Sequence, residues 1–158
     1  MAVQTVYPDT QPAAVAGLRA TQIPATIISR SVETAAVPFG RAVKQGTADK
    51  GCALFGSGDT VILGISVLDR GASGLTVTDG QVTGATENAF GVGESATVIT
   101  KGDVWVTVAA NVVAGNSVFV RPSNGDFQPT NANSAVQIVG ARFDTSASSG
   151  GLAVVRLG

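Results

Sequence analysis

Short apolar runs, each about one β-strand long, alternate with turn-forming residues over the last third of the chain. These runs occupy residues 103–108, 116–121, 135–143 and 151–157, and Gly, Asn, Asp or Ser bounds each of them. Runs of this length with this punctuation are typical of strands joined by tight turns. Because no long amphipathic pattern accompanies them, the sequence predicts an all-β protein.

The middle of the chain adds further strand and turn signals. Residues 59–68 alternate, with Val61, Leu63, Ile65 and Val67 on one predicted face. Asp79-Gly80 is a dipeptide that accepts the two positive φ values of a type I′ hairpin turn. Residues 95–100 and 103–108 are expected as two strands on either side of Lys101-Gly102, and Val104, Val106 and Val108 share one face of the second.

Two other glycines mark changes of direction. Asn124-Gly125 predicts a turn after residues 116–121. In residues 135–143 the apolar phase switches across Gly140, which indicates a bulge or a corner. Together the signals predict a β domain over residues 36–158, with about eight or nine short antiparallel strands in a small β-barrel or β-sandwich; a more irregular β fold stays open.

Residues 1–35 differ from the rest of the chain. Pro8, Pro12 and Pro24 interrupt any regular element, whereas Val15 and several isoleucines would gain from burial. We expect an extended N-terminal arm that orders against a neighbouring subunit. The alternative is an arm that packs back onto its own domain.

Low charge limits the classes of partner. Only 13% of the 158 residues are charged, the net charge is -1, and the seven Arg and three Lys are scattered along the sequence. Direct nucleic-acid binding needs clustered cations, so it is not expected. No apolar run approaches the ~20 residues of a membrane span, and the first residues lack the features of a signal peptide. We therefore expect that the protein is made and kept in a cytoplasm and that it does not associate with a membrane.

The chain offers little material for catalysis. It contains no histidine and one cysteine, Cys52, so the usual nucleophilic triads, zinc sites and disulfides are not expected. Five aspartates fall beside glycine or threonine in expected turns, where capping explains them: Asp59, Asp79, Asp103, Asp126 and Asp144. Two glycine clusters, residues 56–60 and 91–95, are interpreted as loops. No catalytic, cofactor or metal site is predicted, and the protein is not expected to be an enzyme.

Several segments resemble the capsid cement or decoration proteins of tailed bacteriophages. They are GDVWVTVAANVVAGNSVFVRPSNGDFQP (102–129), AVQIVGARFDTS (135–146), GGLAVVRL (150–157), AGLRA (16–20), ISRSVE (28–33) and PFGRAV (38–43). The resemblance implies a structural virion protein that binds the outer surface of a phage head. It also implies that the protein bridges adjacent major capsid protein subunits, stabilises the expanded DNA-filled shell, and forms a homodimer or homotrimer.

This interpretation gives the arm a specific role. Leu18, Ile23, Ile27 and Ile28 are its expected apolar contacts, and Arg30 and Arg41 are expected partners for capsid carboxylates. A second hypothesis is a carbohydrate- or receptor-binding accessory module of a phage tail. A third is an enzyme that relies on a pair of Asp or Glu side chains alone, which would require a deep pocket holding both.

Overall fold

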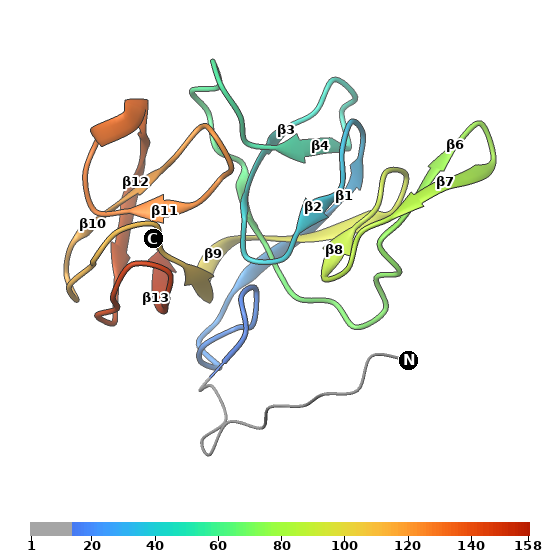
Figure 1. Cartoon of the computed structure of the whole chain (residues 1–158). Helices are drawn as coiled ribbons and strands as arrows, with labels where there is room; N and C mark the ends of the chain where they lie inside the picture. Colours follow the sequence, from blue (N-terminus) through green and yellow to red (C-terminus); the bar gives the residue numbers. More distant parts are fainter. Residues whose placement is uncertain (1–13) are drawn as a thin grey trace, which may run out of the picture.

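The computed structural model describes residues 14–158, and this part of the chain is almost entirely β-strand and loop (Figure 1). The prediction of an all-β protein is confirmed. The only helical element among these residues is a single 3-10 turn, η1 (Ala132–Ser134). The strands are β1 (Thr26–Val32), β2 (Val37–Pro38), β3 (Ala42–Gln45), β4 (Gly51–Leu54), β5 (Gly64–Ser66), β6 (Leu75–Thr78), β7 (Gln81–Ala85), β8 (Ala89–Phe90), β9 (Ser95–Thr107), β10 (Ser117–Val120), β11 (Phe127–Gln128), β12 (Val136–Phe143) and β13 (Leu152–Leu157).

Nine of these strands form one mixed sheet in the order β1-β4-β3-β5-β9-β13-β12-β10-β11. β1 also pairs with β9, but the sheet as a whole is not a closed barrel. Two small sheets, β2–β8 and β6–β7, complete the fold. The expectation of antiparallel strands fails where β1 runs parallel to β4, with Ser31 opposite Gly51, and the isolated bridge between Val108 and Phe127 is also parallel.

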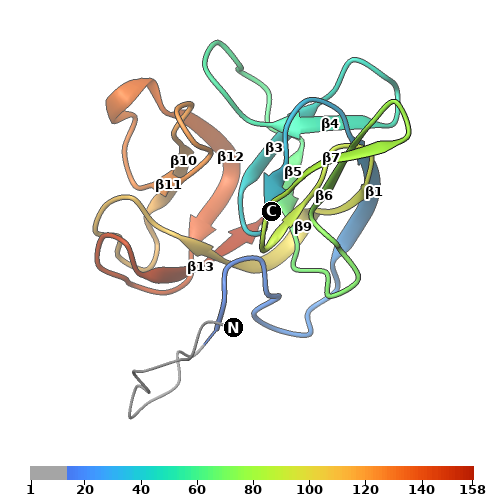
Figure 2. The same ribbon diagram turned by 45° about the vertical axis from the view of Figure 1, so that its right-hand side comes forward.

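Strand β9 connects the two parts of the domain (Figures 1 and 2). Its first half pairs with β1 and β5, and its second half pairs with β13. Gly102 lies between the halves at φ +124°, and a Cβ there would lie 2.8 Å from the Cβ of Ala25. The sequence predicts two separate strands, over residues 95–100 and 103–108. The structure instead keeps them in one strand, because glycine absorbs the change of direction without ending the pairing.

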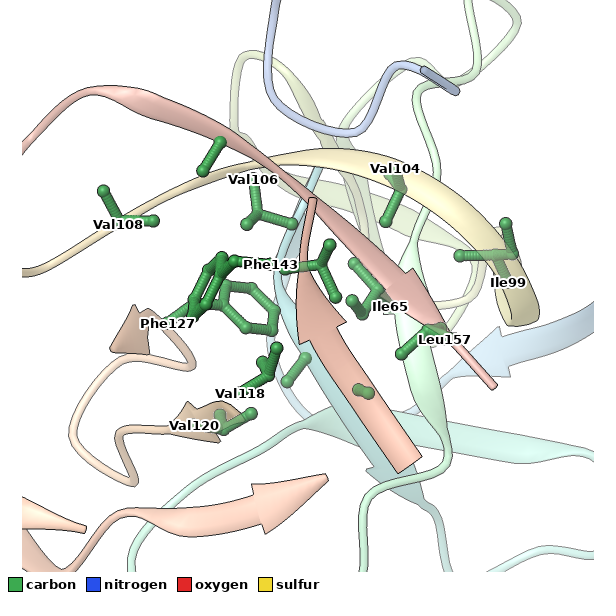
Figure 3. Packing of buried hydrophobic residues seen from close by; sticks show 14 of the residues in the cluster. Ile65, Ile99, Val104, Val106, Val108, Val118, Val120, Phe127, Phe143 and Leu157 are labelled. Atoms are coloured by element: carbon green, nitrogen blue, oxygen red, sulfur yellow. The ribbon is translucent and has the colours of Figure 1, made fainter. Parts of the chain in front are cut away.

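The larger core lies below the second half of β9. Figure 3 shows Val104, Val106 and Val108 in the same core as Phe127 and Phe143, and all five are fully buried, as the predicted alternation requires. Burying a side chain of this size contributes about 1.5–3 kcal/mol relative to leaving it exposed. The apolar phase of β12 does change at Gly140, which has φ +82°. Val136 and Ile138 pack on the core before it, and Ala141 and Phe143 are buried after it.

A second core cluster lies between β1, β3, β4, β8 and the first half of β9. Val32, Val43, Cys52 and Val98 are fully buried in it. The rings of Phe39 and Phe90 meet edge to face, with centroids 5.1 Å apart.

The predicted turn at Asp79-Gly80 is confirmed, whereas the predicted strand over residues 59–68 is shorter than expected. Asp79 and Gly80 have φ values of +51° and +79°, which confirms the tight hairpin between β6 and β7. By contrast, the predicted strand over residues 59–68 shrinks to β5. Val61, expected in the core, is 72% exposed, because residues 55–63 form a loop before the strand begins.

The described part of the expected arm packs on its own domain. β1 pairs with β9 along six positions and with β4, so residues 26–32 are part of the large sheet. Residues 14–25, called here the N-terminal segment, lie against β9. Residues 1–13 lie outside the described residues, and the division of the chain at residue 35 stays a prediction.

Candidate interaction surface

Backbone hydrogen bonds fix the N-terminal segment to the domain. The Gly17 N–H donates to the Trp105 carbonyl (2.7 Å), and the Trp105 N–H donates to the Leu18 carbonyl (2.8 Å). On the other side, the Leu68 N–H donates to the Gly17 carbonyl (2.8 Å). Gly17 has φ +86°, and a Cβ there would lie 2.8 Å from the Cβ of Phe39. Glycine therefore permits an approach that any other residue would block.

A buried carboxylate secures the same segment further along. Asp103 on β9 is fully buried and accepts hydrogen bonds from the N–H (3.2 Å) and the hydroxyl (2.6 Å) of Thr21. The nearest guanidinium nitrogen of Arg156 lies 3.9 Å from this carboxylate. Asp103 was expected in a turn, and the structure corrects this assignment. Donors from the crossing segment thus satisfy the oxygens of this buried side chain.

The segment and β1 present apolar side chains outward. Val15, Leu18 and Ile27 are 49%, 41% and 42% exposed, whereas Ile23 and Ile28 are half-buried. Ile28 packs against the second core cluster and so contributes to the domain as well. The four expected apolar contacts thus lie, exposed or half-buried, on the N-terminal segment and β1. Whether they touch a partner stays a prediction.

The two expected arginines lie in different places. Arg30 is half-buried on β1, and its guanidinium donates to the neighbouring Ser29 carbonyl (3.0 Å). Arg41 forms an ion pair with Asp126 in the turn between β10 and β11. Arg41 is therefore already neutralised within the domain, whereas Arg30 has no ion pair among residues 14–158.

The β6–β7 hairpin is a second exposed element and extends away from the domain (Figures 1 and 2). Leu75, Val77 and Val82 are 37%, 41% and 61% exposed, and Asp79 is the only charged residue in residues 75–85. No backbone hydrogen bond joins the outer edge of β7 to any other described strand. An uncharged free edge with exposed apolar side chains is suited to contact another protein. The sequence predicted the hairpin but not this role.

Glu94 holds the root of the hairpin. Its carboxylate accepts hydrogen bonds from the N–H groups of Ser73 (2.9 Å), Gly74 (3.1 Å) and Gly91 (2.7 Å), and from the Ser73 hydroxyl. Burial alone would raise the pKa of Glu94, but these hydrogen bonds outweigh it and lower the pKa. The loop over residues 91–95 was read correctly as a loop. The sequence does not predict the structural role of Glu94, because Gly91 lies in the same loop but Ser73 and Gly74 come from a distant one.

Two cavities flank the N-terminal segment. One, of about 320 Å³, is lined by Val15, Phe39, Leu68 and Asn88 among others. The other, of about 370 Å³, lies beside Ile23 and is lined by Lys101, Arg142 and Arg156. Within residues 14–158 no group of three His, Cys, Asp or Glu side chains is arranged to hold a metal ion. Over the same residues, no helix has the length and apolar character needed to cross a membrane.

A family model described as structural cement protein (E217 gp24/Pam3 gp6) matches residues 3–158, nearly the whole chain. The chain belongs to this family. It is therefore a structural capsid protein of a phage, and cement proteins are a class of virion component rather than a class of enzyme. The predicted resemblance to phage cement proteins is confirmed.

One solved structure shares the fold of this cement protein. A chain in the capsid of Myoviridae phage XM1 is 18% identical, covers 99% of this cement protein and 98% of its own length, and superimposes with a TM-score of 0.77. The N-terminal base of head fiber gp8.5 of bacteriophage phi29 is 13% identical over 85% of this chain and 95% of its own, with a TM-score of 0.46, too low to bear on the fold. The curated proteins contain no match.

Proposed function

We propose that this cement protein binds the outer surface of a phage head and bridges neighbouring major capsid protein subunits, thereby stabilising the expanded, DNA-filled shell. The observation that carries the proposal is the exposed β6–β7 hairpin, whose one charged residue is Asp79 and whose root is held by Glu94, on a chain of the structural cement family. An isolated two-stranded hairpin is at best marginally stable in water. A hairpin anchored by a multiply bonded carboxylate is preorganised for contact and loses less entropy on binding.

The surface chemistry suits a neutral interface. The core of a protein interface is depleted in charge and is held by apolar contacts and backbone pairing. The exposed Leu18 and Ile27, with the half-buried Ile23 and Ile28, supply apolar area beside β9, and Arg30 supplies a cation for a capsid carboxylate. Arg41 would have to exchange Asp126 for a capsid carboxylate, which makes it the weaker of the two expected arginine contacts.

Bridging explains how a small protein stabilises a large shell. A protein that binds the intact shell better than its separated subunits shifts the equilibrium toward the intact shell. Repetition over many equivalent sites multiplies a modest gain at each site. We further propose that the protein acts as a homodimer or homotrimer on a local symmetry axis, as closed assemblies do.

The binding step is tested by co-sedimentation with purified heads that lack the protein, in expanded and unexpanded forms. Saturable binding that favours expanded heads is expected, and difference density by cryo-electron microscopy should lie on the outside of the shell. Binding to neither form, or density on the inner surface, would contradict the proposal.

Two matched variants test the hairpin. Val82 on the hairpin and Val113 in the loop after β9 are both 61% exposed, so an aspartate at either position meets similar solvent exposure. We expect Val82→Asp to weaken head binding at least tenfold, because it places a charge in an apolar contact. Val113→Asp should bind like the wild type. Equal head binding by the two variants would show that the β6–β7 hairpin is not part of the interface.

A further inference from the structure

Three of the ten Lys and Arg residues of this sparsely charged chain gather at one cavity. They are Lys101 on β9, Arg142 on β12 and Arg156 on β13, and all three line the space of about 370 Å³ beside the N-terminal segment. Ile23, Pro24 and Leu157 add apolar walls, and the remaining lining comes from Gly102, Gly140 and Gly158. These cations are scattered in the sequence, and only the pairing of β9 with β13 and of β13 with β12 brings them together.

The two arginines occupy an unfavourable position relative to each other. Arg142 and Arg156 are direct cross-strand partners in the β12–β13 pair, where like charges destabilise a sheet. Asp144 relieves the repulsion by bridging them, with 3.1 Å to Arg142 Nε and 2.5 Å to Arg156 Nη2. Asp103 approaches Arg156 only to 3.9 Å, and its oxygens already accept from Thr21.

Donors are left over after these contacts. Within residues 14–158, Asp103 and Asp144 are the only carboxylates within 4 Å of a nitrogen of the three cations. Lys101 is exposed and has neither an ion pair nor a side-chain hydrogen bond within that range. The Nε of Arg156 is buried without a hydrogen-bond partner among the described residues. A buried donor without an acceptor is unfavourable, so the hydrogen-bonding capacity of Arg156 is not fully used within the described residues.

We propose that this cavity receives the carboxylate of an Asp or Glu side chain on the major capsid protein. Guanidinium groups form strong, charge-assisted hydrogen bonds with carboxylates, and Lys101 adds a third positive charge at the rim. The apolar walls suit the methylene groups of that side chain. Ile23 and Pro24, which form part of the wall, belong to the N-terminal segment proposed above as a contact, so the cavity is continuous with that surface.

This inference rests on the proposed head binding and adds a charged contact to an otherwise neutral interface. With a net charge of -1, the protein as a whole has no field that would draw it toward an acidic shell. The cavity therefore acts at short range and fixes the register of docking rather than the encounter rate.

The test compares two lysine variants in the full-length protein. Lys101→Glu reverses a charge at the cavity, and Lys50→Glu reverses the charge of another exposed lysine without an ion pair, in the turn between β3 and β4. Affinity for expanded heads is measured at increasing salt. We expect about a tenfold loss of affinity and a weaker salt dependence for Lys101→Glu, and near wild-type behaviour for Lys50→Glu. Arg142→Gln should resemble Lys101→Glu with a smaller loss.

The results distinguish a failure of the cavity proposal from a failure of the proposed head binding. If the wild type binds heads but Lys101→Glu and Arg142→Gln bind equally well with the same salt dependence, the cavity proposal is overturned and head binding stands. If the wild type binds no heads, the cavity proposal and the proposed head binding are both overturned. If the variants keep their affinity for heads but lose self-association in sedimentation velocity, the carboxylate comes from a second copy of the chain, which also overturns the proposal. Thermal melting verifies that the variants are folded.

Discussion

The hydroxyl of Thr21 donates to the carboxylate of Asp103 at 2.6 Å, and this bond ties the N-terminal segment to the buried centre of β9. The Thr21 N–H adds a second bond to the same carboxylate. Because Asp103 is fully buried, its oxygens need hydrogen-bond donors from the protein, and Thr21 supplies two. The segment is thus a structural part of the fold as well as a candidate contact.

Replacing Thr21 tests that role. Thr21→Val keeps the shape of the side chain but removes the hydroxyl donor, so it should lower the free energy of unfolding by about 1–3 kcal/mol. Urea unfolding measures the change. Thr60→Val is the control, because Thr60 is exposed and makes no side-chain hydrogen bond among the described residues. A loss no greater than that of the control would show that the bond contributes nothing to stability.

Glu94→Gln should loosen the β6–β7 hairpin. The neutral amide replaces a carboxylate that accepts four hydrogen bonds, and its NH₂ group would face the N–H donors of Ser73 or of Gly74 and Gly91. We expect amide hydrogens of residues 75–85 to exchange at least tenfold faster, with little change in the β9–β13 pair. Unchanged exchange in the hairpin would mean that the carboxylate does not hold its root.

Stability should fall on acidification. The pKa of Glu33 is lowered by hydrogen bonds from the Thr47 and Ala48 N–H groups and the Thr47 hydroxyl, and that of Glu94 is lowered as described above. Since both folded-state pKa values lie below the unfolded value of about 4.5, the unfolded chain binds more protons. The stabilisation is complete above the unfolded pKa of about 4.5 and is lost as pH falls through the lowered folded-state pKa values of Glu33 and Glu94.

Thermal melts between pH 6 and pH 3 measure this dependence. The wild type should lose melting temperature progressively below about pH 5. The double variant Glu33→Gln/Glu94→Gln should have a lower melting temperature than the wild type at pH 6, and its melting temperature should fall less between pH 6 and pH 3. Equal pH dependence in the two proteins would assign the acid sensitivity to other carboxylates.

Cys52 should be inert in the folded protein. It is fully buried on β4, and burial together with the nearby Glu33 raises the pKa of its thiol to about 11. The thiolate is the reactive species, so a thiol reagent at pH 8 should label native protein very slowly and unfolded protein within minutes. Rapid labelling of the native form would indicate that β4 opens readily.

Local signals predicted local structure well. The φ values at Asp79 and Gly80 and the change of phase at Gly140 follow from the residues themselves. β1 is not predicted because the prolines of residues 1–35 argue against a regular element there, although four of the seven residues of TIISRSV are β-branched and Pro24 lies outside the strand. Its pairing with β9 and β4 shows only in the structure. Long-range pairing is a property of the whole fold and leaves little trace in a single segment.

The same reason limits what could be predicted of the interaction surface. The exposure of Leu18 and Ile27 fits the expected contacts, but Lys101, Arg142 and Arg156 are far apart in sequence and meet only through strand pairing. Likewise, nothing in the residues around Glu94 shows that Ser73 and Gly74 will donate to it.

The most direct test of cement function is the temperature at which DNA-filled heads rupture, measured by dye access to the DNA with and without saturating protein. Heads that lack the protein should rupture at a lower temperature, and adding it back should restore the higher temperature in proportion to the bound copies. Saturated binding that leaves the rupture temperature unchanged would contradict the account, because the protein would then decorate the shell without stabilising it.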